Sequence, residues 1–245
     1  MKNFKVKSIF LTIVFFNCFF TTIARANTEA ERIESDRASL EAKSNILLGE
    51  SSKSNRGERY LNRANLLVVN GKWDLALVDY NKAIQVDPNL AIAYSNRGFV
   101  YYNQNKWNLA LADYNKAIQI DPNLAEPYNN RGLLYYKQKK WDLALADFNK
   151  STQIQSNPNL SLTYSNRGFV YYNQKKWDLA LADFNKSIEI NPDLAEVYIL
   201  RSLVWIELGN KSRSIEDLKT AAEIFQQQNN LAGYQGVTYM LKKLS

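Results

Sequence analysis

Residues 105–118 read NKWNLALADYNKAI, and close copies of this phrase recur along the chain. The others are GKWDLALVDYNKAI at 71–84, KKWDLALADFNKST at 139–152 and KKWDLALADFNKSI at 175–188. Their tryptophans, Trp73, Trp107, Trp141 and Trp177, are separated by 34, 34 and 36 residues. Self-similarity at this period is typical of stacked-repeat proteins, in which each unit buries its apolar face only against its neighbours. The sequence therefore predicts an extended surface rather than a single catalytic pocket.

Each repeat divides into two predicted helices, which in the second repeat cover about residues 92–104 and 107–120. A proline follows the second helix, as at Pro88, Pro122 and Pro192, and ends it because proline lacks the amide donor. We expect repeats at 57–90, 91–124, 125–160, 161–194 and 195–228, and a capping helix within 229–245. The third repeat carries two additional residues near Gln155 and Ser156, and whether they form a hinge stays open.

The first 26 residues have the three parts of a secretory signal peptide. A basic start with Lys2, Lys5 and Lys7 precedes an apolar run over residues 9–20, and Ala24-Arg25-Ala26 supplies a small-residue cleavage site. We expect an exported protein, periplasmic or secreted, with no stable membrane insertion after cleavage. The alternative is an uncleaved signal that tethers the protein to a membrane. Residues 27–56 form a polar leader for which a helix is possible.

The composition restricts the chemistry that the chain can perform. The formal net charge of +7 falls to +3 without residues 1–26, because that segment holds four of the 31 basic residues and none of the 24 acids. This modest charge makes nucleic acid an unlikely partner. There is no histidine, and the single cysteine lies in the predicted signal, so imidazole bases, thiol nucleophiles and soft metal sites are lacking after cleavage. We expect no enzyme activity and no cofactor.

Several residue types recur in phase within each repeat. In the second repeat they stand at Tyr94, Gly98, Tyr101, Ala110, Tyr114, Ala117 and Pro122. The pattern resembles the tetratricopeptide repeat family over about residues 57–228, in the form seen in bacterial exported members. The fifth copy is degenerate, with Lys211, Ser214 and Leu218 at three of these signature positions. The resemblance implies an all-α, right-handed superhelical solenoid of about five repeats that binds proteins or peptides without catalysis.

Matched arginine and aspartate columns run through the repeats with a constant separation of 16 residues. The columns are Arg63, Arg97, Arg131, Arg167 and Arg201 against Asp79, Asp113, Asp147, Asp183 and Asp217. We expect each carboxylate to hold the arginine of its own repeat between the two helices, since a guanidinium fork matches a carboxylate. The alternative is an arginine row for an anionic ligand, which the matched acids would neutralise.

Two further columns are predicted to be structural. A glycine in mid-helix costs about 1 kcal/mol relative to alanine, so the column Gly98, Gly132 and Gly168 indicates a close approach of two helices. For Gly98 we expect Ala110 on the opposite helix. The tryptophans are expected to close the turn of each helix pair against Tyr101, Tyr135 and Tyr171.

In this family the first helices line the concave face, and here they carry an asparagine row beside an aromatic row. The predicted contact residues are Asn62, Asn96, Phe99, Tyr102, Asn130, Tyr136, Asn166, Phe169 and Tyr172. An amide both donates and accepts, so it can pair with a peptide backbone of any sequence, and tyrosine adds contact area with a polar tip. The alternative is that the tyrosines cover neighbouring helices and the asparagines are solvated. Ser95, Asn129 and Ser165 stand where a carboxylate clamp would need lysine.

A lysine row, Lys72, Lys106, Lys140 and Lys176, precedes the tryptophans. Such a row is usually a solvated edge, and the alternative is attraction to an anionic partner or membrane surface. Taken together, the sequence predicts a protein-interaction scaffold or assembly factor that binds an extended polypeptide in its groove. Two alternatives stay open: a self-associating protein that stacks end to end through its fifth repeat, and a glycan binder that uses the aromatic row. Neither the partner nor the oligomeric state is indicated.

Overall fold

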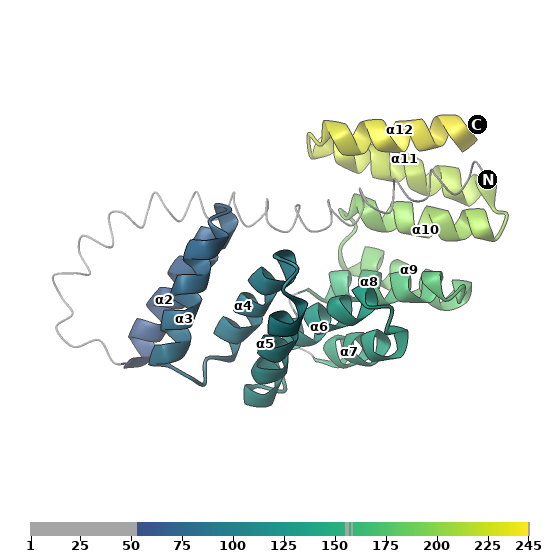
Figure 1. Ribbon diagram of the computed structural model, residues 1–245. Helices are drawn as coiled ribbons and strands as arrows, with labels where there is room; N and C mark the ends of the chain where they lie inside the picture. The colour runs from purple at the N-terminus through teal and green to yellow at the C-terminus, as the bar shows by residue number, and fades with distance from the viewer. Residues whose placement is uncertain (1–52, 155–156, 158, 245) are drawn as a thin grey trace. The chain divides into compact units, whose positions relative to one another are not determined.

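The computed structural model describes residues 53–154, 157 and 159–244, and every element in this part of the chain is a helix (Figure 1). The helices are α2 (Lys53–Val69), α3 (Trp73–Val86), α4 (Ala91–Asn103), α5 (Trp107–Ile120), α6 (Ala125–Lys137), α7 (Trp141–Gln153), α8 (Leu160–Asn173), α9 (Trp177–Ile190), α10 (Ala195–Glu207), α11 (Lys211–Gln227) and α12 (Leu231–Leu244). Consecutive helices pack as pairs, α2 with α3, α4 with α5, α8 with α9 and α10 with α11. The fold is an all-α array of helix–turn–helix repeats.

The described residues divide into two compact units at Leu134 and Tyr135, a boundary that lies within α6. The N-terminal unit holds α2 to α5 and most of α6, and the C-terminal unit holds the end of α6 and α7 to α12. The predicted signal peptide and almost all of the predicted leader lie outside the described residues. The exception is the end of the leader, residues 53–56, which belongs to α2. None of the described helices is long and apolar enough to span a bilayer.

Each first helix turns into its second helix through a residue with a left-handed backbone. The φ angles are 69° at Gly71, 58° at Asn105, 60° at Lys139, 59° at Lys175 and 74° at Gly209. Glycine and asparagine adopt this region at little cost, whereas lysine pays about 1 kcal/mol or more. The second helices α3, α5 and α9 end in extended backbone at Asp87, Asp121 and Asn191, each followed by a proline. The same short turn is therefore repeated even where its sequence is unfavourable.

Gly98 lies against the aromatic side chain that faces it across the helix pair. A Cβ at this position would approach Cε1 of Tyr114 to 2.8 Å and Cβ of Asp113 to 3.2 Å. The nearest atoms belong to Tyr114 and Asp113, because the large ring reaches back over the glycine, and the approach of Ala110 stays a prediction. Gly168 repeats the arrangement in the C-terminal unit, with Phe184 at 2.9 Å. The glycines provide the space in which these fully buried rings pack.

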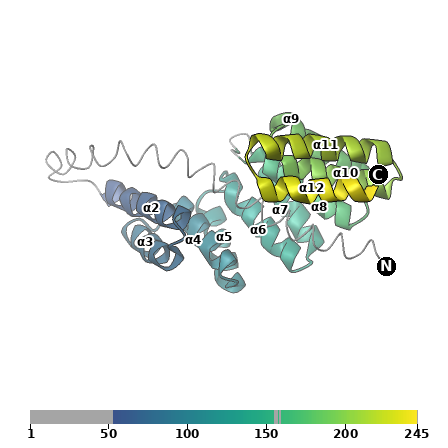
Figure 2. The same cartoon turned by 90° about the horizontal axis from the view of Figure 1, so that it is seen from above.

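The degenerate fifth repeat is covered by α12, which packs on α11 (Figures 1 and 2). Val237 and Met240 of α12 are buried in the core of the C-terminal unit. Gly233 lies so close to Phe225 that a Cβ would meet the ring at 2.7 Å. Since an open repeat end exposes an apolar face, this helix supplies a solvent-facing end to the array.

Candidate functional site

The repeated arginines on the first helices each make several hydrogen bonds to side chains of other helices. In the N-terminal unit, Nε and Nη2 of Arg97 donate to the two carboxylate oxygens of Asp113 at 2.8 and 2.7 Å. The guanidinium also lies over the ring of Tyr94, 5.4 Å from its centroid. These hydrogen bonds raise the pKa of Arg97, because they stabilise the charged guanidinium. The C-terminal unit repeats this geometry at Arg167 with Asp183.

From the second repeat on, each arginine has a further partner in the preceding repeat, and this partner was not predicted. Nη1 of Arg97 donates to the side-chain oxygen of Asn81 on α3 at 2.6 Å. The equivalent pairs are Arg131 with Asn115 at 2.5 Å, Arg167 with Asn149 at 2.8 Å and Arg201 with Asn185 at 2.6 Å. Each of these asparagines follows the aromatic residue of the repeat phrase, and the regular separation from the next arginine is again 16. That second constant separation is the signal in the sequence that could have identified them.

Arg97, Arg167 and Arg201 therefore each join three helices, which favours the structural role over a row for anionic ligands. Arg97 connects α4 with both α5 and α3, so its donors are already satisfied by side chains of the protein. Arg63 in the first repeat pairs with Asp79 but is 59% exposed, against 18% for Arg97. Arg131 and Asp147 belong to different units, and their pairing stays a prediction.

In the N-terminal unit the asparagine row includes a short chain of side-chain hydrogen bonds. Nδ2 of Asn96 on α4 donates to Oδ1 of Asn65 on α2 at 2.9 Å. The same oxygen accepts the hydroxyl of Tyr80 on α3 at 2.8 Å. Asn62, one turn from Asn65, is exposed to solvent. On α6, Oδ1 of Asn130 accepts from Asn129 at 3.3 Å. Asn96 is thus held in orientation by the half-buried Asn65, which is itself bonded to the buried Tyr80.

The aromatic row of the N-terminal unit lies beside these amides. Phe99 on α4 packs against Trp73 on α3, with ring centroids 6.2 Å apart. Tyr102 packs against the buried cluster of Ala110, Tyr114 and Leu134. Burial raises the pKa of Tyr102 to about 12, so its hydroxyl stays protonated at any physiological pH. Phe99 and Tyr102 are half-buried, and each keeps part of its surface accessible.

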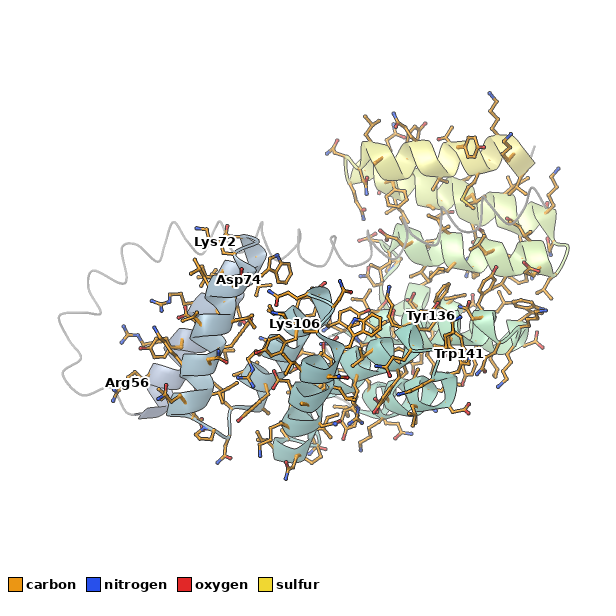
Figure 3. The ribbon with its side chains drawn as sticks, viewed as in Figure 1. Arg56, Lys72, Asp74, Lys106, Tyr136 and Trp141 are labelled. Carbon is orange, nitrogen blue, oxygen red and sulfur yellow. The ribbon has the colours of Figure 1, made fainter. Side chains whose placement is uncertain are left out.

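In the C-terminal unit the aromatic residues stack on one another instead. The ring of Tyr136 lies 5.2 Å from that of Trp141, and both side chains are labelled in Figure 3. It also lies 5.4 Å from the ring of Phe169. Phe169 continues to Tyr172 at 6.1 Å, and Tyr172 to Trp177 at 5.4 Å. Phe169 and Tyr172 are only 3% and 8% exposed, which corrects the expectation that they offer a broad contact surface. Their rings fill the interior beside the repeat turns.

The tryptophans make ring contacts that were not predicted. Trp141 and Trp177 meet the rings of Tyr136 and Tyr172, while the expected contacts with Tyr135 and Tyr171 stay a prediction. Neighbouring helix positions are rotated by about 100° from each other, so the second tyrosine of each pair faces the start of the following helix. The first tyrosine lies instead next to a lysine, since Nζ of Lys140 is 6.0 Å from the ring of Tyr135. The tryptophans are part of the packed framework.

The described residues offer little material for catalysis. No group of three or more histidine, cysteine, aspartate or glutamate side chains gathers there in a way that could hold a metal ion. The pKa of Glu126 and of Glu196 is raised because burial penalises the charged carboxylate. The buried aspartates Asp113, Asp183 and Asp217 pair with arginines.

Two family descriptions match the chain. The one described as TPR repeat matches residues 64–105 and 100–139, and the one described as tetratricopeptide repeat matches residues 125–158 and 161–194. Segments 125–158 and 161–194 each cover one repeat, from α6 to α7 and from α8 to α9, and the other two segments together cover the chain from α2 to α6. The chain belongs to the tetratricopeptide repeat family.

Solved structures with the same fold include proteins of differing description. A structure described as the functional characterization of Pseudomonas aeruginosa pilF is 21% identical, with a TM-score of 0.65, and covers 79% of this chain and 94% of that one. YrrB, described as a TPR protein with an unusual peptide-binding site, is 23% identical, with a TM-score of 0.55 and coverages of 75% and 90%. PilW, described as a widely conserved type IV pilus biogenesis factor, is 17% identical, with a TM-score of 0.64 and coverages of 76% and 92%. No curated protein matches the chain.

The fold and the family define a protein–protein interaction scaffold in general terms. Such scaffolds hold partners by non-covalent contacts along their repeats and are generally not catalysts.

Proposed function

We propose that the first-helix face of the N-terminal unit binds an extended, nearly neutral polypeptide. The observation that carries the proposal is the amide chain from Tyr80 through Asn65 to Asn96. It fixes the amide group of Asn96 through one N–H, and the oxygen of that side chain stays as an acceptor for a ligand. A peptide group presents one donor and one acceptor, so a fixed amide of this kind can pair with the backbone whatever the peptide's sequence.

Preorganisation is what makes this asparagine more useful than a solvated one. Ordering a free side chain on binding costs about 0.5–1.5 kcal/mol. Asn96 is already ordered by its hydrogen bond to Asn65, so peptide binding does not incur this cost at Asn96. Asn62 and Asn130 extend the row along α2 and α6 within the same unit. Asn166 is the corresponding residue on α8 of the C-terminal unit, and a second contact there belongs to the same proposal.

The aromatic residues beside the amides supply apolar contact. Phe99 rests on Trp73 and Tyr102 rests on the core, so both rings are held in place while part of each stays accessible. Tyr136 is likewise half-buried in the C-terminal unit. Rigid aromatic rings contribute much of the energy of protein interfaces because they bury large area at small entropic cost.

The residues beside the asparagine row argue against recognition of a peptide's C-terminal carboxylate. Ser95 is fully buried, so it presents neither a positive charge nor accessible surface at a position where a carboxylate clamp would need lysine. We therefore propose internal backbone recognition rather than capture of a C-terminal carboxylate. The YrrB description, a TPR protein with an unusual peptide-binding site, is consistent with peptide binding on this fold. We further propose that the protein acts after export, where its signal sequence would direct it.

The self-association alternative loses part of its basis, since α12 covers the degenerate repeat through which stacking was considered. The glycan alternative relied on an open aromatic row, and Phe169 and Tyr172 are buried. Polypeptide binding is therefore the function that the geometry favours.

An array of random-sequence peptides, each made with a free and an amidated C-terminus, tests the proposal with the full chain as probe. We expect a subset of peptides to bind regardless of amidation, and Asn96→Ala to weaken that binding about tenfold, the loss of one or two backbone hydrogen bonds. Asn108→Ala on α5 is the matched control, because Asn108 is also an exposed amide but lies on a second helix. The proposal fails if no peptide is enriched, or if both variants bind as the parent does.

A further inference from the structure

The second helices carry a surface that peptide binding does not use. The leucine that follows each tryptophan by two residues is half-exposed in every copy of the repeat phrase: Leu75 at 56%, Leu109 at 50%, Leu143 at 49% and Leu179 at 48%. Each of these helices also exposes a small apolar residue one turn after its leucine. These residues are Val78, Ala112, Ala146 and Ala182. Isolated exposed leucines are common on proteins, but the same leucine at the same position in successive repeats makes a row.

The arginine of each first helix joins the second helices on either side of it. In the C-terminal unit, Arg167 on α8 bonds to Asp183 on α9 and to Asn149 on α7, so both second helices pack on the same first helix. Leu143 and Leu179 precede these partners by six and four residues on the same two helices. The pair is therefore part of one outward-facing surface within this unit, on the second helices rather than on the first.

Positive charge borders this row at the turn that begins each second helix. In the C-terminal unit the turns carry lysine pairs, Lys139 with Lys140 and Lys175 with Lys176, all exposed. Lys139 and Lys175 adopt φ angles of 60° and 59°, where the N-terminal unit has Gly71 and Asn105. Lysine therefore stands at positions where glycine would adopt the positive φ at a lower cost in free energy.

Acidic residues do not cancel this charge. Asp142 and Asp178 are the exposed acids of the same turns, one against each lysine pair. Further along α9, Lys186 pairs with Glu189 at 2.8 Å, and on α7 the exposed Lys150 adds another positive charge. Each turn therefore keeps a surplus of positive charge next to its leucine. The degenerate fifth repeat has Arg213 at the leucine position, so the apolar row ends there while the charge continues.

From this combination we propose that the second-helix surface of the C-terminal unit docks peripherally on an anionic lipid bilayer. Leu143 and Leu179 enter the interface between headgroups and acyl chains, and Lys139, Lys140, Lys175 and Lys176 pair with lipid phosphates. Amphipathic helices lie in the plane of a membrane in this way, with apolar residues below and lysines at headgroup level. A row only one leucine wide fits this interface, where the lysine stems add apolar contact on either side, better than it fits the wide apolar core of a protein interface.

Vesicle co-sedimentation of the full chain tests the docking. Vesicles of phosphatidylcholine alone are compared with vesicles that also contain phosphatidylglycerol. We expect partition onto the anionic vesicles only, weakened by salt, since exposed charges are screened. Replacing the four lysines by glutamine should lower partition about fivefold per lysine. Leu143→Gln with Leu179→Gln should lower it about fivefold per leucine, because each half-exposed side chain can still gain burial.

Matched controls separate the row from other surface residues and from the N-terminal segment. Leu208→Gln with Leu231→Gln changes two leucines that are 45% and 66% exposed but lie outside the row, and it should leave partition unchanged. All variants share residues 1–52, so differences between them report the second-helix surface. Because the changed side chains are exposed, the melting temperatures of all variants should agree.

Three results would overturn the proposal. The parent chain could show no preference for anionic vesicles, or the row variants could partition as the controls do. The third is a concentration-dependent dimer, measured by light scattering without lipid, that the Leu143→Gln and Leu179→Gln changes abolish. That result would assign the row to a second copy of the chain.

Discussion

Two junctions between repeats differ in sequence and solve the same packing problem in different ways. At the regular junction, Arg97 holds Asp113 of its own repeat and Asn81 of the preceding one, 16 residues away on either side. At the junction with the two-residue insertion, Arg167 holds Asp183 at a separation of 16, but its upstream partner Asn149 is 18 residues away. The contact within the repeat is unchanged, and the difference falls entirely on the contact between repeats.

The insertion junction compensates with additional polar contacts. Thr152 accepts a second hydrogen bond from Nη1 of Arg167 at 3.2 Å. Asn157, only 9% exposed, donates to the backbone oxygen of Ser151 and approaches the hydroxyls of Ser151 and Thr163. The regular junction has the alanines Ala83 and Ala93 at the places of Ser151 and Thr163. A longer turn is therefore accommodated by a buried hydrogen-bonded cluster rather than by closer apolar packing.

The largest expected effect tests the contact that both junctions share. Asp113→Ala and Asp183→Ala each leave a mostly buried guanidinium unpaired and should lower the free energy of unfolding by about 3 kcal/mol. Asp79→Ala is the internal control, because Arg63 is 59% exposed and can be solvated, so its cost should be about 1 kcal/mol. Urea denaturation of the three variants measures the order. Equal losses at all three sites would contradict a burial-dependent role.

The second-largest expected effect is on the stability of the insertion junction. Asn157→Ala removes the donor that satisfies Ser151 and Thr163 in a buried place, and we expect a loss of about 2 kcal/mol. Asn123→Ala in the regular turn after α5 changes an exposed asparagine and should cost within about 0.5 kcal/mol. The same denaturation experiment checks both. A neutral Asn157→Ala would mean that the polar cluster does not stabilise the longer turn.

The smallest expected effect compares the arginine–asparagine contact of the regular junction with that of the insertion junction. Asn81→Ala takes away the upstream partner of Arg97 and should cost about 1 kcal/mol, a charge-assisted hydrogen bond reduced by solvent exposure. Asn149→Ala should cost about half as much, since Thr152 still accepts from Arg167. Thermal unfolding of the two variants, and of Asn149→Ala with Thr152→Val, measures the difference. If Asn149→Ala alone cost as much as the double change, Thr152 would have no compensating role.

Sequence patterns predict this molecule well where a residue has one partner at a constant separation. Arg97 and Asp113 follow from the 16-residue spacing, and the helix pairs follow from the repeat phrase and its prolines. The patterns are weaker where neighbouring positions differ only by rotation about a helix, so the contact of Tyr136 with Trp141 was not predicted. Sequence patterns also do not show which residues at one repeat position are buried and which are exposed. Phe99 stays half-buried while Phe169, at the same repeat position, is covered by Tyr136 and Tyr172.

Hydrogen–deuterium exchange of the full chain, with and without a peptide selected on the array, tests the central claim most directly. Binding on the first-helix face predicts that protection increases in α2 and α4, around Asn62 and from Asn96 to Tyr102, while α3 and α5 are unchanged beyond global stabilisation. Protection confined to the second helices, at Leu75 and Leu109 and their neighbours, would contradict the account and assign peptide binding to the opposite face of the repeats.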